Sequence, residues 1–158
     1  MTSDARVRQN WWANGVAAIA CFFFEAIWYT LFLDPWLSGI GRSRAWLHNS
    51  VDRVPEPLQY VTALASALVM ATAISCVVQL TGPQTAKRGM RVATTLWMGF
   101  VFTVWATEYI FEVRPWSLFG INAGFWLIAM ALMGAIVGGW KKNMPTPLAH
   151  ESRAAVKA

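Results

Sequence analysis

The sequence predicts an all-α fold, an integral membrane bundle of four transmembrane helices in a single domain over residues 1–158. Hydrophobic residues make up 56% of the chain and charged residues 13%, whereas about 25% charged is usual in a soluble domain. The apolar residues also form blocks of about 20, long enough to cross a hydrocarbon core of roughly 30 Å as a helix. Because a bilayer offers no water to backbone groups, such blocks must be helical.

The four apolar blocks follow one another, separated by segments rich in proline, glycine and charge. They cover approximately residues 12–33, 58–80, 92–111 and 119–140. A polar tail, expected in the cytoplasm, covers 141–158. Arg6 and Arg8 before the first block are also compatible with a secretory signal peptide. The block is too long for one and contains no small-residue cleavage site, so we expect a retained anchor.

The segment between the first two blocks is longer than a simple connection needs. Its apolar residues approximate helical spacing: Trp36, Ile40, Leu47, Val51 and Val54. We therefore expect an interfacial helix on the outer membrane surface, ended by Pro55 and Pro57. A plain loop is the alternative.

The distribution of basic residues predicts the orientation of the bundle. One side holds nine: Arg6, Arg8, Lys87, Arg88, Arg91, Lys141, Lys142, Arg153 and Lys157. The other side holds four: Arg42, Arg44, Arg53 and Arg114. Cytoplasmic loops carry the excess of Lys and Arg, so both termini should be cytoplasmic in a multi-pass protein of the cell inner membrane. Basic clusters at the ends of apolar blocks also suit lipid headgroups, so membrane lipid rather than nucleic acid is the expected partner.

Small residues at helical spacing predict close helix packing. The second block carries Ala63, Ala67, Ala71 and Ser75, and the fourth carries Gly134 and Gly138. Helices in lipid associate through such rows because small side chains let the backbones approach. The rows fit a neighbour in the same chain equally well as a second copy or a partner membrane protein.

Catalytic patterns are absent from the sequence. His48 and His150 are expected on opposite sides of the membrane, and there is no zinc-ligand spacing, phosphate loop or nucleophile elbow. Cys21 and Cys76 fall inside apolar blocks and are expected to be free thiols. We therefore expect no catalytic residues, no metal site and no cofactor.

Two acidic residues, Glu25 and Glu108, lie inside apolar blocks, where a charge is costly and often functional. Glu25 belongs to a stripe of small or polar residues at steps of three and four: Asn14, Ala18, Cys21, Glu25 and Tyr29. We expect Glu25 to be buried, protonated and hydrogen-bonded to another helix, either as a structural group or as a proton or cation site. Trp28 and Tyr29 beside it could face a cation. Glu108 is expected to reach headgroups or to pair with Arg114, or else to belong to the same proton or cation site.

Several runs carry a resemblance to a known family. They are Trp28-Tyr29 through Leu31-Phe32 to Pro35-Trp36, Leu96-Trp97-Met98-Gly99-Phe100, Phe111-Glu112 with Arg114-Pro115, and Met133-Gly134-Ala135-Ile136 to Trp140. With them the chain resembles domain of unknown function family 1761, small and mainly bacterial membrane proteins. The resemblance covers most of the chain. It implies four transmembrane helices and supplies no activity, cofactor or catalytic residue.

Two functions of different classes are compatible with these observations. The first is a non-enzymatic accessory or structural membrane component, favoured by the packing rows and the lack of catalytic groups. The second is a small proton- or cation-coupled transporter acting as an oligomer through Glu25. In its first helix only, the chain is similar in outline to the small multidrug-resistance transporters. A membrane-embedded enzyme is a third and weaker alternative.

Overall fold

The computed structural model describes residues 7–49 and 54–140, and every regular element in these two ranges is helical, as expected. The elements are α1 (Trp11–Leu31), α2 (Leu33–Gly39), α3 (Arg44–Asn49), α4 (Glu56–Leu80), α5 (Ala86–Leu96), the π-helix η1 (Trp97–Phe102), α6 (Thr103–Phe111) and α7 (Trp116–Gly139). The polar tail expected over 141–158 lies outside the described residues, as do Val51 and Arg53.

Within residues 7–49 and 54–140, three helices are long and apolar enough to cross a membrane. They are α1, α4 and α7, with 21, 25 and 24 residues. The block expected over 92–111 falls on α5, η1 and α6, which follow one another without a gap from Ala86 to Phe111. Each of these three pieces alone is shorter than a membrane span.

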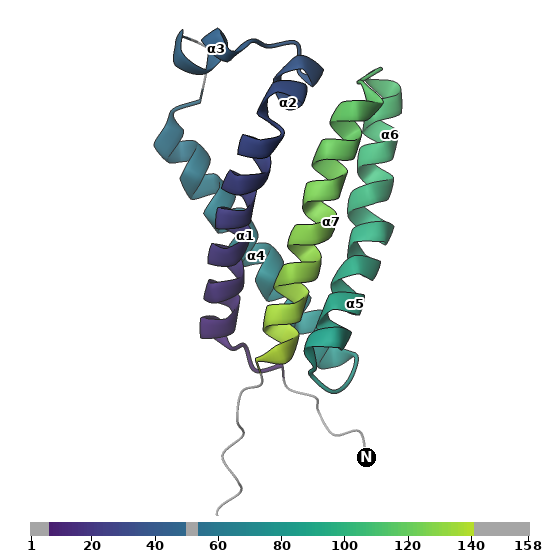
Figure 1. The fold of residues 1–158 in the computed structure, drawn as a ribbon. Coiled ribbons are helices and arrows are strands. Elements are labelled where there is room, and N and C mark those ends of the chain that lie inside the picture. The colour runs from purple at the N-terminus through teal and green to yellow at the C-terminus, as the bar shows by residue number, and fades with distance from the viewer. Residues whose placement is uncertain (1–6, 50–53, 141–158) are drawn as a thin grey trace, which may run out of the picture.

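The helices are arranged side by side around α7. In Figure 1, α5 and α6 form one column on one side of α7, α1 stands on its other side, and α4 crosses behind at an angle. Both ends of the described chain lie at the same end of the bundle, since the Arg8 backbone N–H donates to Gln79 Oε1 (3.1 Å) and Asn10 Nδ2 donates to the Trp140 carbonyl (3.4 Å).

Side-chain caps determine where two of the helices begin. The Asn10 side chain accepts a hydrogen bond from the Ala13 N–H at 3.3 Å, which starts α1 close to the expected residue. Thr85 accepts from the Arg88 N–H at 3.2 Å, so α5 starts at Ala86 and not near residue 92. The hydropathy of the sequence does not indicate residues 86–91 of this helix because they include Lys87, Arg88 and Arg91.

The core lies where α1, α4 and α7 cross. Ala17 and Ala18 of α1 and Ala67 and Ala71 of α4 are almost fully buried, together with Phe125 of α7. The small alanines let the two helices approach, and the larger side chains of α7 fill the space around them. Packing of this kind is the main stabilising contribution between helices in lipid.

Helices α5 and α7 touch backbone to backbone. A Cβ atom built on Gly89 would collide with the Gly134 carbonyl oxygen, and one on Gly138 would lie 2.5 Å from the Thr85 oxygen and 2.9 Å from the Gly89 Cα. Gly134 and Gly138 were singled out in the sequence, but Gly89 was not. Glycine is required at these positions because any side chain would separate the two helices.

The segment after α1 differs from the single interfacial helix that we expected. It holds two short helices, α2 and α3, because Gly41 adopts a left-handed conformation (φ 68°) and interrupts the chain between them. Leu37 of α2 is buried, and a Cβ on Gly39 would lie 2.8 Å from Leu118 Cβ, so α2 packs against α7.

An exposed ion pair connects α2 and α3. Arg44 Nε donates to Asp34 Oδ1 at 2.7 Å and Arg44 Nη2 donates to Asp34 Oδ2 at 2.8 Å. The hydrogen bonds from Arg44 hold the pKa of the Asp34 carboxyl below its usual value. This bidentate contact bridges the turn at Gly41.

Candidate functional site

Glu25 lines a cavity between α1, α2 and α4. The cavity has a volume of about 390 Å³ and is lined by Phe22, Glu25, Ala26, Tyr29, Leu33, Trp36, Gln59, Tyr60 and Ala63. The residues from α1 and α2 recur at steps of three and four, so they form one continuous helical face. Three residues of α4 make the opposite wall.

The cavity exists because α1 and α4 diverge. The two helices are close where their alanines meet and separate toward the end of the bundle that carries α2 and α3 (Figure 1). On the diverging side the Phe22 and Tyr60 rings meet edge to face, with centroids 6.0 Å apart. This ring contact connects α1 and α4 beside the cavity.

The Glu25 side chain is half-buried at this cavity and is not sealed in the bundle core. Within the described part of the chain, no side chain forms a hydrogen bond with the Glu25 carboxyl group, so the expected hydrogen bond to another helix is not formed. No Lys or Arg is among the cavity-lining residues. The carboxylate therefore faces an open, largely aromatic space.

Tyr29 forms a wall of the cavity, and its hydroxyl is hydrogen-bonded to a residue of α7. Its hydroxyl donates to Asn122 Oδ1 at 2.9 Å, and Asn122 Nδ2 donates to the Tyr109 hydroxyl oxygen at 2.7 Å. This network joins α1, α7 and α6. The sequence indicates this network only through Asn122, a polar residue inside the fourth apolar block. The spacing within one helix does not reveal which residues of other helices Asn122 binds.

Of the four residues expected at a cation site, Glu25 and Tyr29 share the cavity and the other two lie elsewhere. Trp28 donates from Nε1 to the Ile121 carbonyl at 3.1 Å and so faces α7. Glu108 is exposed on α6. Arg114 pairs with Glu112, two residues away, and not with Glu108, and its guanidinium lies 5.7 Å from the centroid of the Tyr109 ring.

Two aromatic pairs flank Glu25. Phe22 and Tyr60 form one pair, and Tyr29 and Trp36 form the other, with centroids 5.7 Å apart and ring planes at 73°. Trp36 was expected only as an interfacial residue. It lies on the helical face of Tyr29 and Leu33, because α2 continues the direction of α1.

The packing row of α4 continues directly from the cavity into the core. Ala67, Ala71 and Ser75 are buried, whereas Ala63 is half-buried and forms part of the cavity wall. The same helical face therefore packs tightly over part of its length and lines an open space over the rest.

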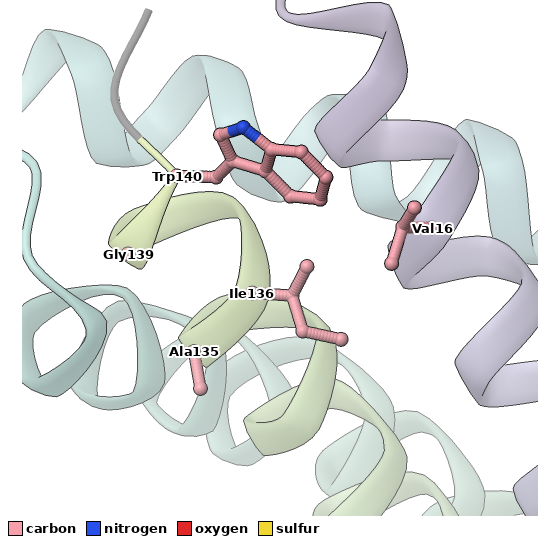
Figure 2. Close-up of a pocket in the computed structure, with 5 residues that line it drawn as sticks. All are labelled: Val16, Ala135, Ile136, Gly139 and Trp140. Atoms are coloured by element: carbon pink, nitrogen blue, oxygen red, sulfur yellow. The ribbon is translucent and has the colours of Figure 1, made fainter.

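A second hollow lies between α1 and α7 near the end of the bundle where the described chain begins and ends. Its volume is about 660 Å³ and its lining is apolar: Val16, Ala135, Ile136, Gly139 and Trp140. Figure 2 shows the Trp140 ring between α7 and α1, with its nitrogen at the edge facing away from Ile136. Ligand sites usually combine apolar walls with a few convergent polar groups, so the Glu25 cavity is the stronger candidate.

The model of a family described as a protein of unknown function (DUF1761) matches residues 12–138. The chain belongs to this family. The match runs from α1 to the last turn of α7, so the Glu25 cavity and the α5–α7 contact both lie in the DUF1761 region. No curated protein and no solved structure matches the chain.

Proposed function

We propose that this DUF1761 protein is a non-enzymatic accessory or structural component of the bacterial inner membrane, with four spans and both termini in the cytoplasm. The observation that carries the fourth span is the unbroken helix formed by α5, η1 and α6 from Ala86 to Phe111. At 1.5 Å per residue for its α-helical turns, a helix of this length can cross a hydrocarbon core of roughly 30 Å.

The charges at the two ends of the bundle support the orientation. Arg8, Lys87, Arg88 and Arg91 belong to the end at which the described chain begins and ends. The other end carries three of the described basic residues: Arg42, Arg44 and Arg114. The positive-inside rule assigns the first end to the cytoplasm.

The four-span topology can be tested with single cysteines and a membrane-impermeant thiol reagent in intact cells, in a variant in which Cys21 and Cys76 are replaced by alanine. A cysteine at Gly41 should react, and cysteines at Gln84 and Ala158 should react only after the cells are permeabilised. If α5, η1 and α6 do not cross, the chain has three spans, and Ala158 would react in intact cells. That result would refute the proposed topology.

The polar groups inside the bundle support the non-enzymatic role. Tyr29, Asn122 and Tyr109 bind one another and join three helices, and Asn14 donates to Gln9 Oε1 (2.9 Å) and to the Thr72 hydroxyl (3.2 Å). Hydrogen bonds between helices hold membrane bundles together. These residues therefore have a structural use that requires no chemistry.

The Glu25 cavity favours the second candidate, a small proton- or cation-coupled transporter acting as an oligomer. Reconstitution into vesicles separates the two. An accessory component should give no uptake of a hydrophobic cation such as ethidium under an imposed pH gradient. Uptake that depends on the gradient and disappears in Glu25→Gln, but not in Glu108→Gln, would replace the accessory role by transport.

A further inference from the structure

We propose that the cavity between α1, α2 and α4 binds a hydrophobic organic cation, whose positive group lies between Glu25 and the surrounding aromatic rings. The inference rests on the proposed placement of α1 and α4 in the bilayer, because this placement makes the space between them accessible from the lipid.

The first argument is the charge of the cavity. Glu25 contributes a carboxylate, and none of the lining residues is a lysine or arginine. An acidic group at membrane depth is normally paired with a cation or kept for a function. In the described chain Glu25 has no such pair, so a mobile cation would supply the missing partner.

The second argument is the aromatic lining. Four rings surround the position next to Glu25: Phe22, Tyr29, Trp36 and Tyr60. A cation over such a ring gains about 0.5–1 kcal/mol at an exposed site and about 2 kcal/mol or more when desolvated. Because Asn122 holds the Tyr29 hydroxyl at 2.9 Å, this ring is already in position before a ligand arrives.

The third argument distinguishes an organic cation from a metal ion. Ca²⁺ needs six to eight oxygen ligands and Mg²⁺ needs an octahedral set. The cavity side chains offer one carboxylate, one amide at Gln59 and two phenol groups, and one of the phenols already binds Asn122. Aromatic rings attract the diffuse charge of an organic ammonium or phosphonium group. They cannot replace the oxygen ligands that Ca²⁺ or Mg²⁺ requires.

Size and access fit a small amphipathic molecule. A volume of about 390 Å³ falls within the range of about 300–1,000 Å³ that is usual for small-molecule sites. The rim includes Tyr60, which is 56% exposed, and Leu64 nearby on α4 is 41% exposed. An apolar tail could therefore extend from the cavity along α4 into the acyl chains.

Two sources can provide this chemistry: a hydrophobic cation dissolved in the membrane, or the ammonium headgroup of a lipid such as phosphatidylethanolamine. The test uses the full chain purified in a non-ionic detergent, with tetraphenylphosphonium as probe and isothermal titration as readout. We expect saturable binding at one site, at least tenfold weaker in Glu25→Gln. Neutral triphenylphosphine oxide, of similar shape, should also bind at least tenfold more weakly.

Matched variants separate the site from general effects on the fold. Tyr60→Leu removes an exposed ring of the cavity and should weaken binding several-fold, whereas Trp116→Leu removes a similarly exposed ring outside it and should leave binding unchanged. Glu108→Gln removes the other intramembrane acid and should also have no effect. Tyr60→Leu keeps the test decisive if Glu25→Gln does not fold.

Added phosphatidylethanolamine identifies the source. If it competes with tetraphenylphosphonium, and native mass spectrometry finds it retained by the wild type but not by Glu25→Gln, the natural ligand is the lipid headgroup. If it does not compete, the ligand is a dissolved cation. Absence of saturable binding, or equal binding by wild type, Glu25→Gln and Tyr60→Leu, would overturn the proposal. Because the measurement is made in detergent, this failure is distinct from an incorrect topology.

Discussion

Adding a single methyl group at Gly134 should weaken the contact between α5 and α7. The new Cβ would lie 2.7 Å from Ala93 Cβ and closer still to the Gly89 carbonyl oxygen. The optimal separation of two carbon atoms is roughly 3.5–4.0 Å. Neither obstacle can rotate away, since one is backbone and the other is itself a Cβ, so the two helices must move apart.

The magnitude follows from two opposing contributions. Overpacking costs about 1–3 kcal/mol, and an obstacle made of backbone favours the upper end of that range. Replacing glycine by alanine inside a helix returns about 1 kcal/mol. The net loss for Gly134→Ala is therefore about 2 kcal/mol, or a Tm about 4–8 °C lower by the scaling for a chain of this size.

The same helix provides a matched control. A Cβ on Gly120 of α7 meets nothing within 4 Å, so Gly120→Ala should raise the free energy of unfolding by up to about 1 kcal/mol. Both variants can be compared with the wild type by thermal unfolding in one detergent, followed by circular dichroism. A Tm for Gly134→Ala equal to or above that of the wild type would refute the backbone contact.

Three further predictions concern other contacts. Ala67→Leu should cost about 1–3 kcal/mol by overpacking the buried face of α4, whereas Ala65→Leu, on the exposed face, should have little effect. Both can be measured by the same thermal unfolding assay, and equal effects would mean that the wrong face was assigned. Asn122→Leu should lower the free energy of unfolding by about 1–3 kcal/mol, because the hydroxyls of Tyr29 and Tyr109 lose their hydrogen-bond partner. Unchanged resistance to unfolding by SDS would contradict this network. The folded pKa of Asp34 lies below the unfolded value, so the stabilisation from Arg44 is complete above the unfolded pKa and is lost as the pH falls through the folded pKa. Arg44→Gln should move the NMR titration of the Asp34 carboxyl to higher pH, and an unmoved midpoint would exclude the ion pair in solution.

The helices could be predicted from the sequence because their signals are local. Hydropathy located α1, α4 and α7 to within a few residues, and alanine and glycine spacing indicated the faces that carry Ala67 and Gly134. The first six residues of α5 were missed because their basic side chains lower the mean hydropathy of this segment. The division of the following loop into α2 and α3 depends on the left-handed conformation of Gly41, which many glycines do not adopt.

The site could be predicted only in part, because its shape depends on how the helices cross. The spacing of Glu25 and Tyr29 placed them on one face of α1, which agrees with the cavity lining. The same spacing also predicted that Glu25 is buried, whereas it is half-buried. The periodicity of one helix does not reveal that α4 diverges from α1 at this level. The contribution of Tyr60 likewise depends on the tilt of α4, and that of Trp36 depends on α2 continuing the face of α1.

The π-helix η1 has a consequence for the register of the chain. A π turn contains one residue more than the α turn it replaces, so residues after Phe102 are displaced around the helix axis relative to an uninterrupted α-helix. One residue corresponds to about 100° of rotation at 3.6 residues per turn. If the same residues were wound as a regular α-helix, Gly89 could still face α7, but Tyr109 would be rotated away from Asn122. The π turn therefore allows one continuous helix to make two different contacts with α7. Gly89 contacts it through the backbone, and Tyr109 contacts it through a hydrogen bond.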